Sequence, residues 1–140
     1  MALRLTLKPN ERIVINGCVI QNSDRRQMIT IENHADVVRE SDLLKEDEAR
    51  TPVKEVYFLI QASLLDQNVR EKLIPKVQKK LGQLVPLFHD EMSKHFFEAA
   101  QHVSTSDYYN AMRSLRPVIN YEAQLFEMIN AKNKKTGTDG

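Results

Sequence analysis

The sequence predicts an α+β protein: a small N-terminal antiparallel β-sheet (residues 1–39) followed by a C-terminal helical bundle of about four helices (residues 40–131). Two observations predict this division. Apolar and polar residues alternate near the N-terminus, which is the period of a half-buried strand. From residue 51 onward, apolar residues recur every three or four positions, which is the period of an amphipathic helix. The polar, glycine-containing residues 132–140 are predicted to be a flexible tail.

Alternation and turn residues mark the strands. Pro9-Asn10 and Asn16-Gly17 are both turn signals. Residues 3–26 are therefore predicted to form a β-hairpin that ends in a polar corner over residues 21–26. The predicted strands are 3–8, 12–15, 19–20, 27–32 and 36–39.

The predicted sheet has few strands, and they are short. Such a sheet is marginally stable alone and needs a helix or a second chain to cover it. We therefore expect the protein to pair through the sheet as a homodimer. The single cysteine, Cys18, falls within the sheet and is expected to be a small buried thiol.

An acidic connector follows at residues 40–50. Ser41 can cap a short helix that holds Leu43 and Leu44. Two interpretations stay open for the acidic residues of this segment. They form either a solvated connector or an acidic face that, if the protein binds a nucleic acid such as RNA, keeps it away from one side of the protein and orients it on the other.

Cap residues mark the helices. Thr51-Pro52 supplies an N-cap and a first-turn proline, and residues 105–107 (Thr-Ser-Asp) are a second cap signal. The stripe of the last helix contains one polar intrusion, Glu122. The predicted helices begin at residues 51, 68, 86 and 105, and their apolar stripes reach residues 64, 81, 103 and 129.

Two prolines and one long stripe complicate this bundle. Pro75 is expected to kink or break the second helix, and Pro117 divides the last into two helices or bends it. The stripe from Val85 to Val103 is expected to pack in the bundle core. The alternative for this stripe is a helix–helix contact between chains.

Composition limits the function classes. The chain has 140 residues, of which 28% are charged, and its net charge is +1. Any nucleic-acid binding must therefore come from a local basic patch. A single cysteine fits a reducing compartment, and we find neither a secretory leader nor a long uncharged apolar run, so we expect a cytoplasmic protein without membrane contact.

Basic residues gather in the predicted sheet. Residues 1–50 contain no aromatic side chain, so edge or backbone recognition of RNA is favoured over base stacking on aromatic rings. The candidate RNA-binding residues are Arg4, Lys8, Arg12, Arg25, Arg26 and Arg39. A second basic cluster, which is either a solvated helix face or a flank of the RNA surface, comprises Arg70, Lys72, Lys76, Lys79 and Lys80.

We predict no enzyme and no cofactor. The chain has too few glycines for a phosphate-binding loop, and nothing places a base beside Cys18. One set of residues has metal-ligand types on a single helix face, but that face is expected to be exposed, so no metal is predicted. This set is Glu91, His95, Glu98 and His102.

Four segments together resemble one family. They are L-x-L-x-L-K-P-x-E-R-I-V-I-N-G at 3–17, V-I-Q-N-S-D-R-R at 19–26, T-P-V-K-E-V-Y-F at 51–58 and R-E-K-L at 70–73. In order and spacing they resemble the FlbT family of flagellum-biosynthesis regulators, over the chain to about residue 130. The resemblance implies a non-catalytic post-transcriptional regulator that binds the 5′ untranslated leader of flagellin mRNA and represses it by promoting mRNA decay. Ser23 stands where we expect a glycine in this family, so the corner need not have a positive φ.

A second resemblance lies inside the first. L-x-L-T-x-K-P-x-E-x-I-x-I is similar to the opening of CsrA, a small dimeric β-protein that binds mRNA leaders, and residues 37–40 are similar to the end of its last strand. This implies a CsrA-like sheet, a strand-exchanging homodimer, and RNA contacts by Lys8 and Arg39. Leu7 stands where that family places a basic residue. The two segments are closer together here, so part of the sheet is missing or rearranged.

A second function stays open beside RNA binding. The amphipathic helices could bind flagellin, or another flagellar assembly factor or regulator, and so control flagellin synthesis without touching RNA. The two functions differ in salt dependence, because contacts between basic side chains and phosphates weaken steeply as salt rises. An apolar helix contact does not weaken in this way.

Overall fold

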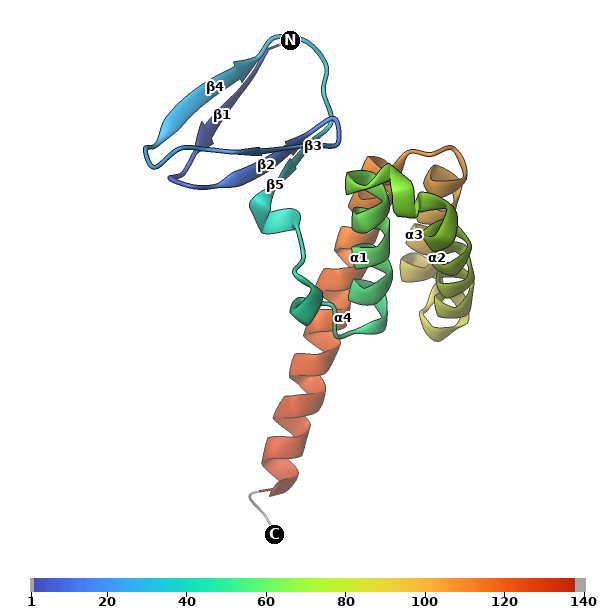
Figure 1. Cartoon of the computed structure of the whole chain (residues 1–140). Helices are drawn as coiled ribbons and strands as arrows, with labels where there is room; N and C mark the ends of the chain where they lie inside the picture. Colours follow the sequence, from blue (N-terminus) through green and yellow to red (C-terminus); the bar gives the residue numbers. More distant parts are fainter. Residues whose placement is uncertain (1, 138–140) are drawn as a thin grey trace.

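The computed structural model describes the backbone of residues 2–137 and the side chains of residues 2–133. A β subdomain at the N-terminus is joined by a short connector to four helices (Figure 1). The α+β fold predicted from the sequence is confirmed. None of the helices in the described part of the chain has the length and apolar character needed to cross a membrane.

The strands form two sheets. They are β1 (Leu3–Leu7), β2 (Arg12–Ile15), β3 (Cys18–Gln21), β4 (Gln27–Ile31) and β5 (Val37–Arg39). β1 pairs with β4 in an antiparallel ladder, and β2 lies between β3 and β5 in a second, three-stranded sheet (Figure 1). The prediction of a single sheet, with a hairpin over residues 3–26, is therefore wrong. Both edges of β2 are already paired, so β1 takes β4 as its partner.

Among the described residues, only β2 and β3 form a hairpin between consecutive strands. Its turn, Asn16-Gly17, is confirmed, with φ of 50° and 78° at the two residues. Two positive φ angles match the twist of the flanking strands. A Cβ at position 17 would lie 3.4 Å from the carbonyl oxygen of Leu64, so glycine also lets the turn approach the first helix closely. Ser23 is not among the positive-φ residues, as expected.

The β subdomain contributes to two hydrophobic cores. Leu5, Leu7 and Ile13 are buried in a small core between the two sheets. Val14 and Val38 point the other way and join the main core of the helices. The protein's own helices therefore cover one face of the three-stranded sheet. Cys18 is exposed, against expectation, because it lies on β3, an edge strand whose four residues are all exposed.

The helices follow the predicted order with shifted ends. The connector holds two short 3₁₀ turns, Glu40–Asp42 and Glu46–Glu48, in place of one capped helix. The helix predicted from residue 86 starts later, because residues 85–87 form a 3₁₀ turn. The helices are α1 (Pro52–Leu65), α2 (Arg70–Leu84), α3 (Asp90–Ser104) and α4 (Tyr108–Gly137), with a further 3₁₀ turn at Gln67–Val69.

Neither internal proline ends its helix. Pro75 lies inside α2 and Pro117 inside α4. Both prolines are exposed, so the carbonyl groups that lose a hydrogen bond one turn earlier lie on the solvent side of the helix. Of the kink or break expected at Pro75, the break is therefore absent, and residues 108–137 form one helix.

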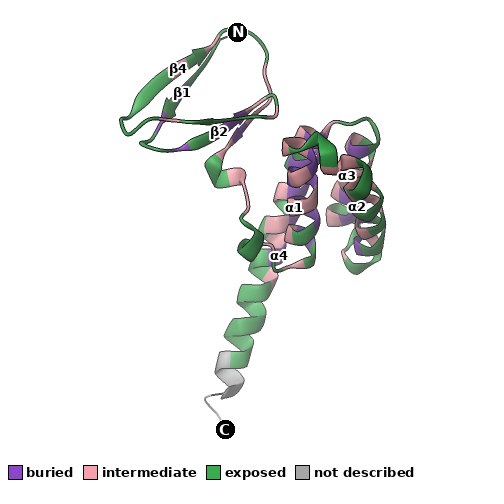
Figure 2. Cartoon of the chain, in the orientation of Figure 1, coloured by how far each residue is buried: buried purple, intermediate pink, exposed green. Residues whose placement is uncertain are grey.

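The long stripe of α3 packs inside the bundle. Phe96, Ala99 and Val103 are buried against the neighbouring helices. The core interpretation is confirmed, and the stripe is not free to contact another chain. α4 instead extends past the other helices (Figure 1) and is exposed there (Figure 2). It continues to Gly137, through most of the predicted tail, and residues 138–140 lie outside the described residues.

Glu122 explains the polar intrusion in the α4 stripe. Its buried carboxylate accepts hydrogen bonds from the Thr51 hydroxyl and from the Val53 N–H at 3.4 Å. These two donors lie at the N-terminus of α1, where helix N–H groups lack partners within the helix. A carboxylate is also stabilised by the positive end of the helix dipole. Glu122 therefore ties α4 to the start of α1.

Replacing Glu122 should weaken this link. We expect Glu122→Ala to lower the free energy of unfolding by about 1–3 kcal/mol, because the buried Val53 N–H and the half-buried Thr51 hydroxyl lose their acceptor. Urea unfolding followed by circular dichroism measures this change. Glu127→Ala, at an exposed position of the same helix, is the control and should change stability by less than about 0.5 kcal/mol. Equal effects of the two substitutions would contradict the capping role.

Candidate nucleic-acid interface

The outer face of the β1–β4 ladder is exposed and basic. Side chains that face each other across an antiparallel ladder point to the same side. Arg4 is opposite Thr30 and Thr6 is opposite Met28, and all four are exposed. Leu5 and Leu7 point to the other side and are buried. Within the paired residues, the outer face carries no acidic side chain.

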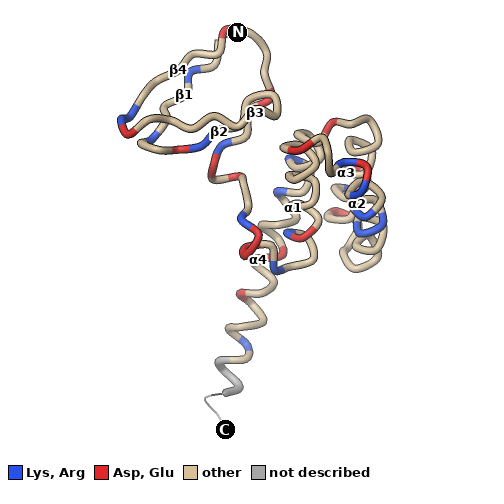
Figure 3. Tube along the Cα trace, viewed as in Figure 1, with Lys and Arg blue, Asp and Glu red and all other residues tan. Residues whose placement is uncertain are grey.

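Two loops at one end of this ladder add further basic residues. Leu7 is opposite Gln27, so the next step of the register brings Lys8 near Arg26. Both residues are exposed, as is the neighbouring Arg25. Lys8, Arg25 and Arg26 are called the basic corner from here on. Figure 3 shows basic residues at this end of the β subdomain. Asp24 is the acidic residue next to Arg25 in the sequence.

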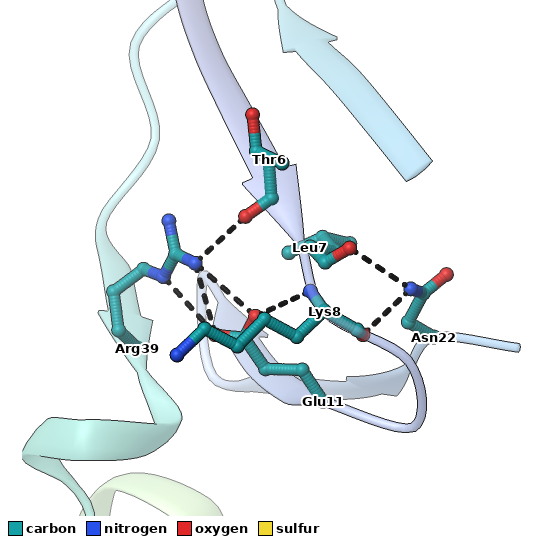
Figure 4. Close-up of polar contacts among 6 residues, drawn as sticks. All are labelled: Thr6, Leu7, Lys8, Glu11, Asn22 and Arg39. Atoms are coloured by element: carbon teal, nitrogen blue, oxygen red, sulfur yellow. Dashed lines mark hydrogen bonds and ion pairs between the residues drawn. The ribbon is translucent and has the colours of Figure 1, made fainter. Parts of the chain in front are cut away.

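Asn22 fastens the two loops together. Its side-chain amide donates hydrogen bonds to the carbonyl oxygens of Lys8 at 2.8 Å and Leu7 at 3.3 Å (Figure 4). It also donates to the carbonyl oxygen of Arg25 at 2.9 Å. Two backbone hydrogen bonds of 2.8 Å, from Asn10 to Ser23 and from Asn22 to Glu11, also join the loops. The basic corner is therefore held in place by backbone contacts, while its charged ends face solvent.

Arg39 has a different role from the other candidates. Its guanidinium forms an ion pair with Glu11 at 2.9 Å and donates a hydrogen bond of 2.9 Å to the carbonyl oxygen of Thr6 (Figure 4). Its side chain is 33% exposed. The guanidinium thus joins β5 to the end of β1 and to the loop before β2. We interpret Arg39 as a residue that positions the basic corner.

The Glu11 carboxylate is the centre of this contact. It also accepts a hydrogen bond of 2.8 Å from the Lys8 backbone N–H. The Lys8 N–H, assisted by the Arg39 guanidinium, lowers the pKa of Glu11 below its ordinary value of 4.5, although burial opposes this shift. Glu11 and Asn22 are structural residues that sequence reasoning missed. The only signal was their polar character in segments of otherwise extended chain.

Arg12 lies apart from the basic corner's exposed surface. It borders a cleft of about 770 Å³ between the β subdomain, the connector and α1. The acidic residues Glu40, Asp47 and Glu48 also border this cleft. A polyanion is therefore attracted to the outer side of the β subdomain and repelled from the connector side.

The second basic cluster divides into two groups. Arg70 is used within the fold, because its Nε donates to the carbonyl oxygen of Ser63 at 2.5 Å and its guanidinium lies 5.0 Å from the centre of the Tyr108 ring. Lys80 lies 3.7 Å from a carboxylate oxygen of Glu55. The remaining lysines, 72, 76 and 79, are exposed.

The candidate metal ligands on α3 do not form a cluster. His95 lies 3.6 Å from Glu98, and His102 lies 3.8 Å from Asp107. Among the residues that the structure describes, no group of three or more His, Cys, Asp or Glu side chains is close enough to hold a metal ion.

Comparison with known proteins places the chain in one family. The family model "Flagellar protein FlbT" matches residues 3–126. The chain is similar to the "Flagellum biosynthesis repressor protein FlbT" of Caulobacter vibrioides (strain ATCC 19089 / CIP 103742 / CB 15), with 33% identity over 87% of each chain. It is also similar to the "Probable flagellum biosynthesis repressor protein FlbT" of Rhodopseudomonas palustris (strain TIE-1), with 37% identity over 89% of this chain and 98% of that one. No solved structure matches the chain.

The contact between Glu11 and Arg39 should make stability depend on pH. A lowered carboxyl pKa in the folded state stabilises the fold above the ordinary pKa of 4.5, and this contribution is lost as the pH falls below that value. We expect Glu11→Gln to lower the free energy of unfolding by about 1–2 kcal/mol at neutral pH. The difference from wild type should shrink under acid conditions. Urea titrations at several pH values measure it, and a difference independent of pH would contradict the assignment.

Proposed function

The chain belongs to the FlbT family of flagellar proteins, and we propose that it represses flagellum synthesis after transcription by binding the 5′ untranslated leader of flagellin mRNA. The names of its relatives support the repressor role in flagellar regulation. The RNA contact is supported by the exposed basic surface of the β subdomain. One observation carries this proposal: Arg4, the basic corner and the outer β1–β4 face form one exposed surface.

The chemistry of this surface suits single-stranded RNA. Lysine and arginine can neutralise phosphates, and the planar guanidinium of arginine can stack on an unpaired base. Thr6 and Thr30 can hydrogen-bond with base edges or sugar hydroxyls, and Met28 gives the face an exposed apolar side chain. Arg39 supports this surface through Glu11, whereas Arg12 borders the acidic cleft on the connector side. The acidic connector directs RNA to this side of the protein.

The proposed regulation needs no catalytic site. The binding surface contains basic, hydroxyl and apolar side chains, and none is paired with a group that would activate it as a nucleophile. Decay of the mRNA would follow because binding exposes or masks parts of the leader to cellular nucleases. Flagellin mRNA is translated in the cytoplasm, which is where we propose that the protein acts.

A homodimer is part of this proposal. β1 and β4 form a two-stranded sheet in which each strand has one edge without a partner strand among the described residues. An open edge can accept a strand from a second copy. Pairing in this way would place two basic corners on one assembly, so that a single leader could contact both.

A second candidate function is a protein-interaction module for flagellin or another flagellar assembly factor. The observation that favours it is the far end of α4, where Phe126 and Ile129 are 46% and 51% exposed. Both continue the helix face that Leu115 and Val118 bury in the bundle. An apolar helix face of this kind suits a groove on another protein.

The RNA proposal can be tested with purified protein and the flagellin mRNA leader. We define the β-face variant as Arg4→Gln/Lys8→Gln/Arg26→Gln. It should bind the leader at least about tenfold more weakly at physiological salt. Its plot of log affinity against log salt should be less steep by about 2, because each phosphate contact to a single strand contributes about 0.7. Fluorescence anisotropy across a salt series measures both quantities.

The matched control removes three charges elsewhere. The control variant is Arg50→Gln/Lys94→Gln/Arg113→Gln, at exposed positions outside the β subdomain. It should bind with nearly the wild-type affinity. Equal losses in the two variants would indicate a general charge effect and contradict recognition by the β face. A wild-type protein that binds no leader even at low salt would contradict direct RNA binding.

The second function makes a different prediction. Under it, Phe126→Asp/Ile129→Asp should abolish flagellin binding, because charges would enter an apolar contact. RNA affinity should not change. Isothermal titration with flagellin at low and high salt measures the contact, which should be insensitive to salt. Gln124→Asp, an exposed polar position of the same segment, is the control. Unchanged flagellin binding by the double variant would contradict this function.

A further inference from the structure

Three lysines form a row along the solvent side of α2. Lys72, Lys76 and Lys79 are spaced by four and three residues, so they share one face of the helix and span about 10 Å along its axis. All three are exposed, and the buried residues Val77 and Leu81 lie on the opposite face. These residues are called the lysine row.

The lysine row has no acidic partner in the described part of the chain. The ion pair of α2 involves Lys80, which reaches Glu55 on α1. Like charges at three- and four-residue spacing destabilise a helix. Repulsion among the three lysines therefore opposes the stability of this helix, and Pro75 further weakens it.

The charge distribution of the whole chain makes this row unusual. The net charge is only +1, so acidic residues elsewhere balance the basic ones. A large share of the acids lies in the connector, as Glu40, Asp42, Glu46, Asp47 and Glu48. Acidic and basic residues are thus segregated on the surface. They create local electrostatic potentials that the small net charge does not reveal.

The row lies far from the basic corner. α2 packs against α1, and the β subdomain meets the other side of the bundle, where Gly17 approaches the end of α1. Figure 3 shows the basic residues of α2 across α1 from the β subdomain. One short RNA segment at the basic corner therefore cannot also cover the row, but a longer strand can reach both.

We propose that the lysine row is a second RNA-binding site, which holds the phosphate backbone of the same leader at a distance from the basic corner. This inference rests on the proposed function, because it takes RNA as the ligand. Lysine is a compact point charge without the planar geometry that reads bases, so the row contributes affinity and not sequence selection. Two separate sites on one strand raise the affinity for long RNA through effective concentration.

The test compares two RNA lengths and two sets of residues. The α2 variant is Lys72→Gln/Lys76→Gln/Lys79→Gln, in which glutamine keeps the helix propensity and removes the charge. One RNA is the full flagellin leader. The other is the shortest fragment of the leader for which the wild type has a higher affinity than the β-face variant. Affinity is measured for both RNAs across a salt series. Circular dichroism checks that each variant is folded.

For the full leader, the α2 variant should lose about tenfold in affinity, and its salt dependence should be less steep by about 2. For the short fragment, it should equal the wild type. The charge-retaining variant Lys72→Arg/Lys76→Arg/Lys79→Arg should bind the full leader like the wild type. The control variant should also bind it nearly as the wild type does.

Several outcomes would overturn the inference. Wild-type affinity and salt dependence of the α2 variant, together with a defect in the β-face variant, would reject the lysine row alone. Equal losses for the short and the full RNA would reject a separate site. If the wild type binds neither RNA, the proposed function fails and this inference fails with it. If only the α2 variant is impaired, the lysine row stands and the β face is rejected.

Discussion

Strand β2 connects the two parts of the molecule through the alternation of its side chains. Ile13 points into the small core between the sheets, and Val14 points into the main helical core; both are fully buried. A shift by one position would turn each of these side chains to the opposite face, so each would leave the core that it fills. Its partners β3 and β5 fix its register on either side. The small sheets, which would be marginal alone, are thereby attached to a bundle that has a larger core.

Local patterns were sufficient for much of this fold. The Asn-Gly turn and the threonine cap of α1 depend on a few neighbouring residues, and both occur where the sequence predicts them. The pairing of β1 with β4 was missed because it joins residues twenty or more positions apart, and alternation does not identify a strand's partner. Pro75 and Pro117 were judged by their type, whereas their effect depends on which side of the helix faces solvent.

The sequence predicted which residues form the candidate site better than it predicted how they are arranged. The exposed basic residues of the β subdomain follow from the sequence, because charged side chains alternate there with leucines. The structural role of Arg39 does not follow from the sequence. Its partner Glu11 lies 28 residues earlier and is brought near by the pairing of β2 with β5. The contacts of Arg70 could not be predicted from the sequence either. Its guanidinium contacts Ser63 and Tyr108, although the sequence indicated an exposed basic side chain.

The position of Cys18 has a practical consequence. It is the only cysteine, and it is exposed on edge strand β3, so a thiol-reactive fluorophore can be attached to the β subdomain without entering either core. All tyrosines and phenylalanines lie at or after position 57, in the helical part. Intrinsic tyrosine emission and a label at Cys18 are thus two separate spectroscopic reporters. Coincident unfolding curves from the two would show that β2 makes the halves melt as one cooperative unit, and separate curves would show that each half melts independently.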